Sequence, residues 1–161
     1  MSHPFGIMRG MCLQCDGYSE DDVNRMVDLH IRVYGYHVTQ VEERDPWCYT
    51  IGLQQSFGHP ELVTTTVKMS TQVGLIQTVA SMLTGSGEID HEELGRIGIR
   101  LVPVHRSHLA TGLVGSWESF YGRPATPGSF LQILPPKSWL CPCHQNAVAR
   151  LDRPPTTRRT K

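Results

Sequence analysis

The sequence lacks most of the features that assign a protein to a functional class. It carries no net charge at pH 7, because 15 Lys and Arg residues balance 15 Asp and Glu residues. Its mostly apolar stretches are interrupted within a few residues by Gly, Thr, Gln or Ser, which excludes a transmembrane helix. Residues 1–10 have neither the charged start nor the apolar run of a secretory signal. We therefore expect a cytoplasmic protein that makes no contact with membranes.

Complete catalytic motifs are missing as well. Gly85-Ser86-Gly87 lacks the lysine and the following helix pattern of a phosphate-binding loop. Ser116 and Ser119 lack the sequence context of a nucleophile elbow. No internal repeat is visible, and 161 residues suffice for one domain with a sizeable core. The absence of a catalytic motif favours a binding protein over an enzyme.

The most informative residues that are present are four cysteines at the two ends of the chain. Cys12 and Cys15 form a Cys-x-x-Cys, and Cys141 and Cys143 form a Cys-x-Cys followed directly by His144. About 125 residues separate the two pairs. Structural zinc takes four ligands in a tetrahedron, mostly thiolates with some imidazoles. The spacing therefore predicts a structural zinc site that clasps the two ends of the chain.

Several alternatives for this site stay open. His144 can replace Cys143 as the fourth ligand, because the Cys-x-Cys spacing is tighter than the usual two-residue gap. A site with only three protein ligands would leave a position for water and could be catalytic. The thiols can also form a redox pair or stay unlinked, although no strand precedes Cys12 as a thioredoxin-like site requires. The fifth cysteine, Cys48, lies on a predicted strand and is expected to be a small core residue.

The periodicity of the apolar residues predicts an α+β domain. Helical spacing extends from Ser19 to Gly35 and again from Ser70 to residues 85–87. Residues 117–121 are expected to form a further short helix. Because helices and strands do not alternate strictly, we expect a single domain with a mostly antiparallel mixed sheet and two main helices. The predicted strands are residues 36–43, 47–53, 61–67, 99–104 and 129–134.

The two ends of the chain are expected to lie outside the folded domain. Residues 1–10 are a predicted flexible leader, residues 11–149 the domain, and residues 150–161 a basic disordered tail. The tail has five cations and one acidic residue, so it carries +4 and the rest of the chain −4. Pro154 and Pro155 prevent a helix there. Nucleic acid or an acidic partner could bind through this tail, and otherwise it is a solvated terminus.

The other residues suited to acid–base or metal chemistry lie at predicted strand ends. His59 and Glu61 stand at the entrance of one strand, and His105 and His108 follow the end of another. Side chains at such positions can line a pocket and act as a general base or bind a metal. The alternative is that they are turn and surface residues with no special role. His30 falls on the buried stripe of the first helix, where we expect a hydrogen-bonded core histidine and not a ligand.

Two motifs on the predicted strands are the most specific in the chain: Tyr-Thr-Ile-Gly-Leu at residues 49–53 and Pro-Glu-Leu at residues 60–62. With them the chain resembles a bacterial, actinobacterial-type family, the domain of unknown function numbered 4262. The resemblance covers about residues 11–140 and supports the fold and location, but the family has no established reaction. After Pro136 the chain departs from the Trp-Pro-Trp-like segment of the family, so the second cysteine pair is expected to be particular to this branch. Further matching motifs are residues 11–16, 34–36 and 131–133.

We interpret the chain as a cytoplasmic zinc-binding module that binds a protein partner or a small ligand without catalysis. The first alternative is a metal-dependent hydrolase that uses His59, Glu61 and His105. The second alternative is a zinc- or redox-responsive regulator, in which loss of the metal frees both ends of the chain, including the basic tail.

Overall fold

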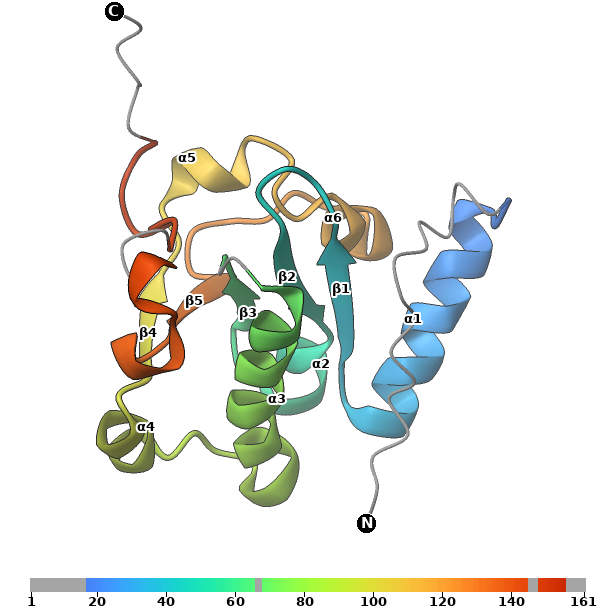
Figure 1. Ribbon diagram of the computed structural model, residues 1–161. Coiled ribbons are helices and arrows are strands. Elements are labelled where there is room, and N and C mark those ends of the chain that lie inside the picture. Colours follow the sequence, from blue (N-terminus) through green and yellow to red (C-terminus); the bar gives the residue numbers. More distant parts are fainter. Residues whose placement is uncertain (1–16, 66–67, 145–147, 156–161) are drawn as a thin grey trace, which may run out of the picture.

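A five-stranded sheet runs through the computed structural model, which describes residues 17–65, 68–144 and 148–155 (Figure 1). The strand order is β1-β2-β3-β5-β4, and neighbouring strands are antiparallel except for the parallel pair β3 and β5. The prediction of one α+β domain with a mostly antiparallel mixed sheet is therefore confirmed. The strands are β1 (His37–Val41), β2 (Trp47–Ile51), β3 (Glu61–Thr64), β4 (Arg100–Pro103) and β5 (Phe130–Leu134).

Six α-helices accompany the sheet within the described residues. The two long ones, α1 and α3, are the main helices that the sequence predicts, and α6 is the predicted short helix. The strand predicted over residues 47–53 ends early, because Gly52 adopts φ +113° and α2 starts directly after it. The helices are α1 (Glu20–Tyr34), α2 (Leu53–Phe57), α3 (Met69–Ser86), α4 (His91–Ile97), α5 (Arg106–Leu109) and α6 (Gly115–Tyr121), followed by the 3-10 turns η1 (Lys137–Trp139) and η2 (Pro142–His144).

Local sequence sets both ends of α1. The Ser19 hydroxyl accepts a hydrogen bond from the backbone N–H of Asp22, and the Asp22 carboxylate accepts one from the N–H of Ser19. This capping box satisfies two N–H groups that would otherwise lack a partner. At the other end Gly35 adopts φ +86° and donates its N–H to the Ile31 carbonyl at 2.8 Å. Glycine is favoured at such a left-handed position, so the predicted helix between Ser19 and Gly35 is confirmed.

Helices cover both faces of the sheet. Leu62 and Val63 are neighbours on β3, so their side chains point to opposite faces, and they belong to two separate core clusters. The Leu62 cluster includes α3, which runs along β2 and β3 (Figure 1). The Val63 cluster includes α1, α5 and α6. Each fully buried Leu, Ile or Val contributes about 1.5–3 kcal/mol, so these two clusters supply most of the stabilisation.

The junction between β2 and α2 packs against the C-terminal end of α1. A Cβ atom added at Gly52 would lie 2.6 Å from Cγ1 of Ile31, and one added at Gly35 would lie 2.8 Å from the Phe57 ring. Both glycines also have positive φ angles. The close approach of α1 to the β2–α2 junction therefore depends on glycine for both space and backbone conformation.

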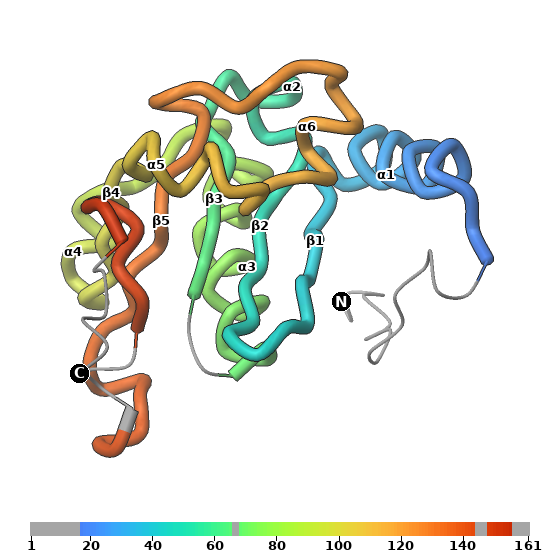
Figure 2. The backbone as a smooth tube through the Cα atoms, turned by 90° about the horizontal axis from the view of Figure 1, so that it is seen from above, coloured from blue at the N-terminus to red at the C-terminus, as the bar shows by residue number. Residues whose placement is uncertain are grey.

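After the second 3-10 turn, a C-terminal segment (residues 148–155) lies beside β4 and α5 (Figures 1 and 2). Within it, Leu151 is only 5% exposed. The predicted leader, residues 1–10, and residues 156–161 of the predicted tail lie outside the described residues. Among the helices in the described part of the chain, none has the length and apolar character needed to cross a bilayer.

Candidate functional site

The Glu61 carboxylate is the most deeply buried acidic group that the structure describes, with no exposed surface. Its Oε2 atom accepts hydrogen bonds from the Thr50 hydroxyl at 2.7 Å and the Leu53 N–H at 3.1 Å. Its Oε1 atom accepts from the N–H groups of Gly52 at 2.8 Å and Gln54 at 3.4 Å. Three of these donors are the otherwise unpaired N–H groups around the start of α2. Glu61 therefore anchors the β2–α2 junction onto β3.

The electrostatics of this anchor follow from its burial. Burial raises the pKa of the Glu61 carboxyl, while the hydrogen bonds from Thr50 and the backbone oppose that rise. The pKa of the nearby Tyr121 hydroxyl is raised to about 12, first by burial and then by the Glu61 charge. Because each carboxylate oxygen already accepts two hydrogen bonds, Glu61 has little capacity to act as a general base. Glu61, a candidate only in the alternative hydrolase interpretation, is thus surrounded by groups that hold it in place.

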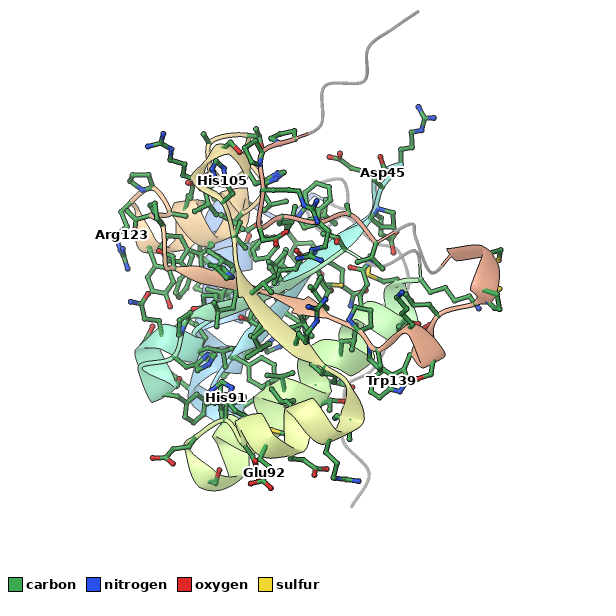
Figure 3. All side chains as sticks on the ribbon, turned by 90° about the vertical axis from the view of Figure 1, so that its left-hand side faces the viewer. Asp45, His91, Glu92, His105, Arg123 and Trp139 are labelled. Atoms are coloured by element: carbon green, nitrogen blue, oxygen red, sulfur yellow. The ribbon has the colours of Figure 1, made fainter. Side chains whose placement is uncertain are left out.

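The structure gives the predicted histidines separate partners. The Nδ1–H of His59 donates to the Pro60 carbonyl at 2.7 Å, and its pKa is lowered by burial and by the neighbouring His91 of α4. His105 instead caps α5, since its Nδ1 accepts from the Ser107 N–H at 3.3 Å. His91 and His105 lie well apart in Figure 3. The side chains of His59 and His105 thus turn toward different elements.

The cysteine turn at η2 places two thiols against each other. Cys141 and Cys143 are both exposed, and their Sγ atoms lie 2.7 Å apart. The hydrogen bond between them lowers the pKa of Cys141 and raises that of Cys143, and the Lys68 ammonium lowers both. Lys68 is the N-cap residue of α3, so this turn lies beside the start of the longest helix. A thiolate is favoured near such a cation.

The other predicted ligands cannot be placed. Cys12 and Cys15 lie outside the described residues, and so does the side chain of His144. Within residues 17–65, 68–144 and 148–155, no three His, Cys, Asp or Glu side chains come close enough to hold a metal ion. Two converging thiols have two available chemistries: they can ligate a soft metal such as zinc, or they can be oxidised to a disulfide.

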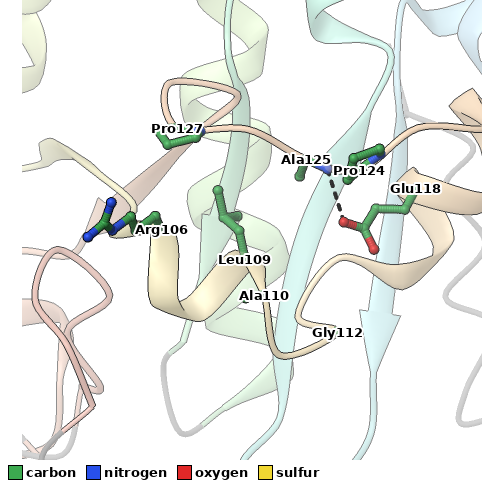
Figure 4. Close-up of a pocket in the computed structure, with 8 residues that line it drawn as sticks. All are labelled: Arg106, Leu109, Ala110, Gly112, Glu118, Pro124, Ala125 and Pro127. Atoms are coloured by element: carbon green, nitrogen blue, oxygen red, sulfur yellow. Dashed lines mark hydrogen bonds between the residues drawn. The ribbon is translucent and has the colours of Figure 1, made fainter.

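A shallow depression of about 370 Å³ lies between α5, α6 and the loop after α6 (Figure 4). Its apolar surface comes from Leu109, Ala125 and Pro127, with Arg106 on one side and Glu118 on the other. The Glu118 carboxylate accepts a hydrogen bond from the Ala125 N–H at 3.0 Å. The two charged groups of the depression, Arg106 and Glu118, are therefore not directed at a shared point. The depression lacks the convergent polar groups of a typical ligand site.

A pair of histidines, His30 of α1 and His37 of β1, joins these two elements. Sequence patterns indicate only His30. The Nδ1 atoms of His30 and His37 lie 2.8 Å apart, and Tyr34 contacts the His30 ring edge-on. The prediction that His30 is hydrogen-bonded is confirmed, but the residue is half-buried and not a core histidine. Its partner His37 has no signal in the sequence. Burial, together with the charge of His30, lowers the pKa of His37 to about 4, and burial lowers that of His30.

This pair predicts a loss of stability in mild acid. The unfolded chain protonates His37 near pH 6.5, whereas the folded chain resists protonation down to about pH 4, so the unfolded state binds more protons in this window. We expect the free energy of unfolding to fall by about 2 kcal/mol between pH 6.5 and pH 4. Urea unfolding of His37→Leu should show a flatter pH dependence. The matched variant Gln40→Leu, at an exposed position of the same strand, should keep the original slope, and an unchanged slope in His37→Leu would contradict the assignment.

The fold and these sites define a small α+β domain whose most specific motifs, at residues 49–53 and 60–62, build an internal carboxylate anchor. The family model for DUF4262, a domain of unknown function, matches residues 30–138, which is 109 of the 161 residues. The chain therefore belongs to this family. Both cysteine pairs lie outside the matched residues. Neither a curated protein nor a solved structure matches the chain.

Proposed function

We propose that the protein is a non-catalytic binding module whose two ends are clasped by zinc. The ligands are Cys12, Cys15 and Cys141, with Cys143 or His144 as the fourth. The observation that carries the proposal is the convergence of the Cys141 and Cys143 thiols on one exposed turn. A second pair from the other end of the chain completes a tetrahedral site, which matches the chemistry of structural zinc. Reduced thiols of this kind fit a cytoplasmic location.

The absence of catalysis in this proposal is supported by the placement of the acid–base candidates. Glu61 is saturated by four donors, and His59 and His105 contact different elements. A hydrolase would need such groups to converge on one substrate. Because these groups do not converge, we assign a binding role to the scaffold. The bound species is a partner protein or a small ligand.

Metal analysis of the protein purified without added zinc tests this proposal. We expect about one zinc per chain in the wild type and near zero in Cys141→Ser, because a site that loses a thiolate loses most of its affinity. The matched control is Cys48→Ala, which removes a buried thiol on β2 that contacts the Met69 sulfur and should keep its zinc. Wild-type protein with less than about 0.2 zinc per chain would refute the clasp.

One observation favours a redox role as the second candidate. The two thiols of the turn already lie 2.7 Å apart, and the pKa of Cys141 is lowered, so hydrogen peroxide could oxidise the pair to a disulfide with loss of two hydrogens as water forms. If metal analysis finds no zinc, mass spectrometry after peroxide treatment decides this candidate. A loss of about 2 Da within the peptide that carries both cysteines would support it.

A further inference from the structure

The C-terminal segment is held along its main chain by side chains of the domain. The Gln132 Nε2 donates to the Ala149 carbonyl at 2.6 Å, and its Oε1 accepts from the Leu151 N–H at 2.8 Å. Thr65 donates its hydroxyl to the same Ala149 carbonyl at 2.6 Å. Gln132 lies at the centre of β5 with no exposed surface. One buried glutamine thus binds the backbone of the segment at two positions, residues 149 and 151.

The start of α5 holds the next residues in the same way. The His105 N–H donates to the Leu151 carbonyl at 2.7 Å, and the Nε2–H of His108 donates to the Arg153 carbonyl at 2.7 Å. The Leu151 side chain enters the core cluster that contains Val104 and Leu109. The segment is therefore bound through its backbone and one apolar side chain, as peptides are when they are recognised in extended form.

The binding residues and the bound segment belong to different parts of the chain. Thr65, Gln132, His105 and His108 all fall within the residues that match the family model, whereas the segment begins ten residues after the match ends. We call these four residues the seat of the segment; they belong to the matched residues, whereas the segment follows them in the chain. If the segment left, the amide of Gln132 would lose the Ala149 carbonyl and the Leu151 N–H and would keep the Thr65 hydroxyl, to which its Nε2 donates at 2.9 Å. An empty seat would favour another extended backbone.

We propose that this seat is a peptide-binding groove, and that its partner is an extended protein segment with a leucine-like residue in the position of Leu151. Residues 149–153 are a built-in competitor that occupies the groove until a partner displaces them. The inference deepens the binding role proposed above by naming the partner class, but it does not depend on zinc, because the bonds to the segment come from Thr65, Gln132, His105 and His108.

The test uses the full chain with its own segment displaced. Leu151→Asp places a charge in the apolar pocket and should release the segment, leaving the groove intact. The probe is a fluorescein-labelled peptide with the sequence of residues 148–155, followed by anisotropy. We expect it to bind Leu151→Asp at least about tenfold more tightly than the wild type, whose tethered segment competes at high effective concentration. Adding Gln132→Ala should remove this binding, and a probe with aspartate for leucine should not bind.

A second form of the protein covers the case in which Leu151→Asp does not fold. A protease site introduced at residues 145–147 allows the folded wild-type chain to be cut, after which the native segment is held only by the groove. We expect the labelled peptide to exchange into this nicked protein, and failure to exchange would overturn the proposal. A dimer formed by exchange of segments, seen by light scattering, would overturn the partner assignment, because the occupant would then be a second copy.

Zinc analysis and peptide binding on the same purified protein separate the two proposals. If the wild type contains less than about 0.2 zinc per chain but the Leu151→Asp variant still binds the peptide, the groove stands and the clasp is refuted. One zinc per chain without peptide binding would support the clasp and refute the groove.

Discussion

Replacing Glu61 with alanine should lower the free energy of unfolding by about 4 kcal/mol. The substitution leaves the N–H groups of Gly52, Leu53 and Gln54 and the Thr50 hydroxyl without their acceptor in a site that has no exposed surface. Hydrogen bonds to a charged group contribute about 1.5–3 kcal/mol each, and losing such a buried network costs about 3–5 kcal/mol. A typical domain is stable by only about 5–15 kcal/mol, so this substitution would remove a large part of the free energy of unfolding. Urea unfolding followed by circular dichroism measures the loss.

Glutamine at position 61 gives a sharper test of the geometry. Both carboxylate oxygens accept hydrogen bonds, so a glutamine must turn its NH₂ group toward at least one backbone N–H. We expect a loss of about 2 kcal/mol for Glu61→Gln, although the shape is preserved. The graded controls are Glu118→Ala, whose carboxylate accepts one backbone N–H and should cost about 1 kcal/mol, and the exposed Glu92→Ala, which should cost less than about 0.5 kcal/mol. Equal effects at all three positions would contradict the anchor.

Loss of the zinc site should lower the melting temperature by about 10 °C. The clasp joins residues about 125 positions apart, and closing so long a loop removes conformational entropy from the unfolded chain. The sheet and its two core clusters include neither Cys141 nor Cys143, so the domain should remain folded at room temperature. A loss of about 3 kcal/mol corresponds to this shift for a chain of such length. Calorimetry with and without a chelator measures the effect.

The cysteine variants also test whether both ends bind one metal. If Cys12 and Cys141 ligate the same ion, Cys12→Ser, Cys141→Ser and the double variant should all melt at about the same temperature, because each removes the same site. The chelator should have no further effect on any of them. Additive shifts, or a wild-type melting temperature that the chelator leaves unchanged, would show that the two ends are not joined by a metal.

Elements with strong local signals could be predicted from the sequence. The capping box at Ser19 and the left-handed Gly35 define α1 without any tertiary information. The strand motifs at residues 49–53 and 60–62 also indicate β2 and β3. Their chemical role could not be predicted, because it depends on the antiparallel register that pairs Tyr49 with Val63 and brings Thr50 beside Glu61. A glutamate at a strand entrance has the same sequence signal whether it anchors a loop or acts on a substrate.

Long-range contacts account for what the sequence patterns miss. The backbone groups that Gln132 binds lie 17 and 19 residues later in the chain, beyond two 3-10 turns. Nothing in the composition of a basic segment with two prolines indicates that Leu151 is buried. His37 likewise meets His30 only because Gly35 reverses the chain between them. Such contacts follow from topology and not from periodicity, so only the folded structure reveals the groove and the histidine pair.

Zinc K-edge X-ray absorption of the purified wild-type protein tests the proposed clasp most directly. We expect a shell of three or four sulfur ligands at about 2.3 Å, with at most one imidazole, and no protein-bound zinc signal in either Cys12→Ser or Cys141→Ser. Absence of zinc, or a shell made mainly of oxygen and nitrogen, would contradict a site built from the two terminal cysteine pairs.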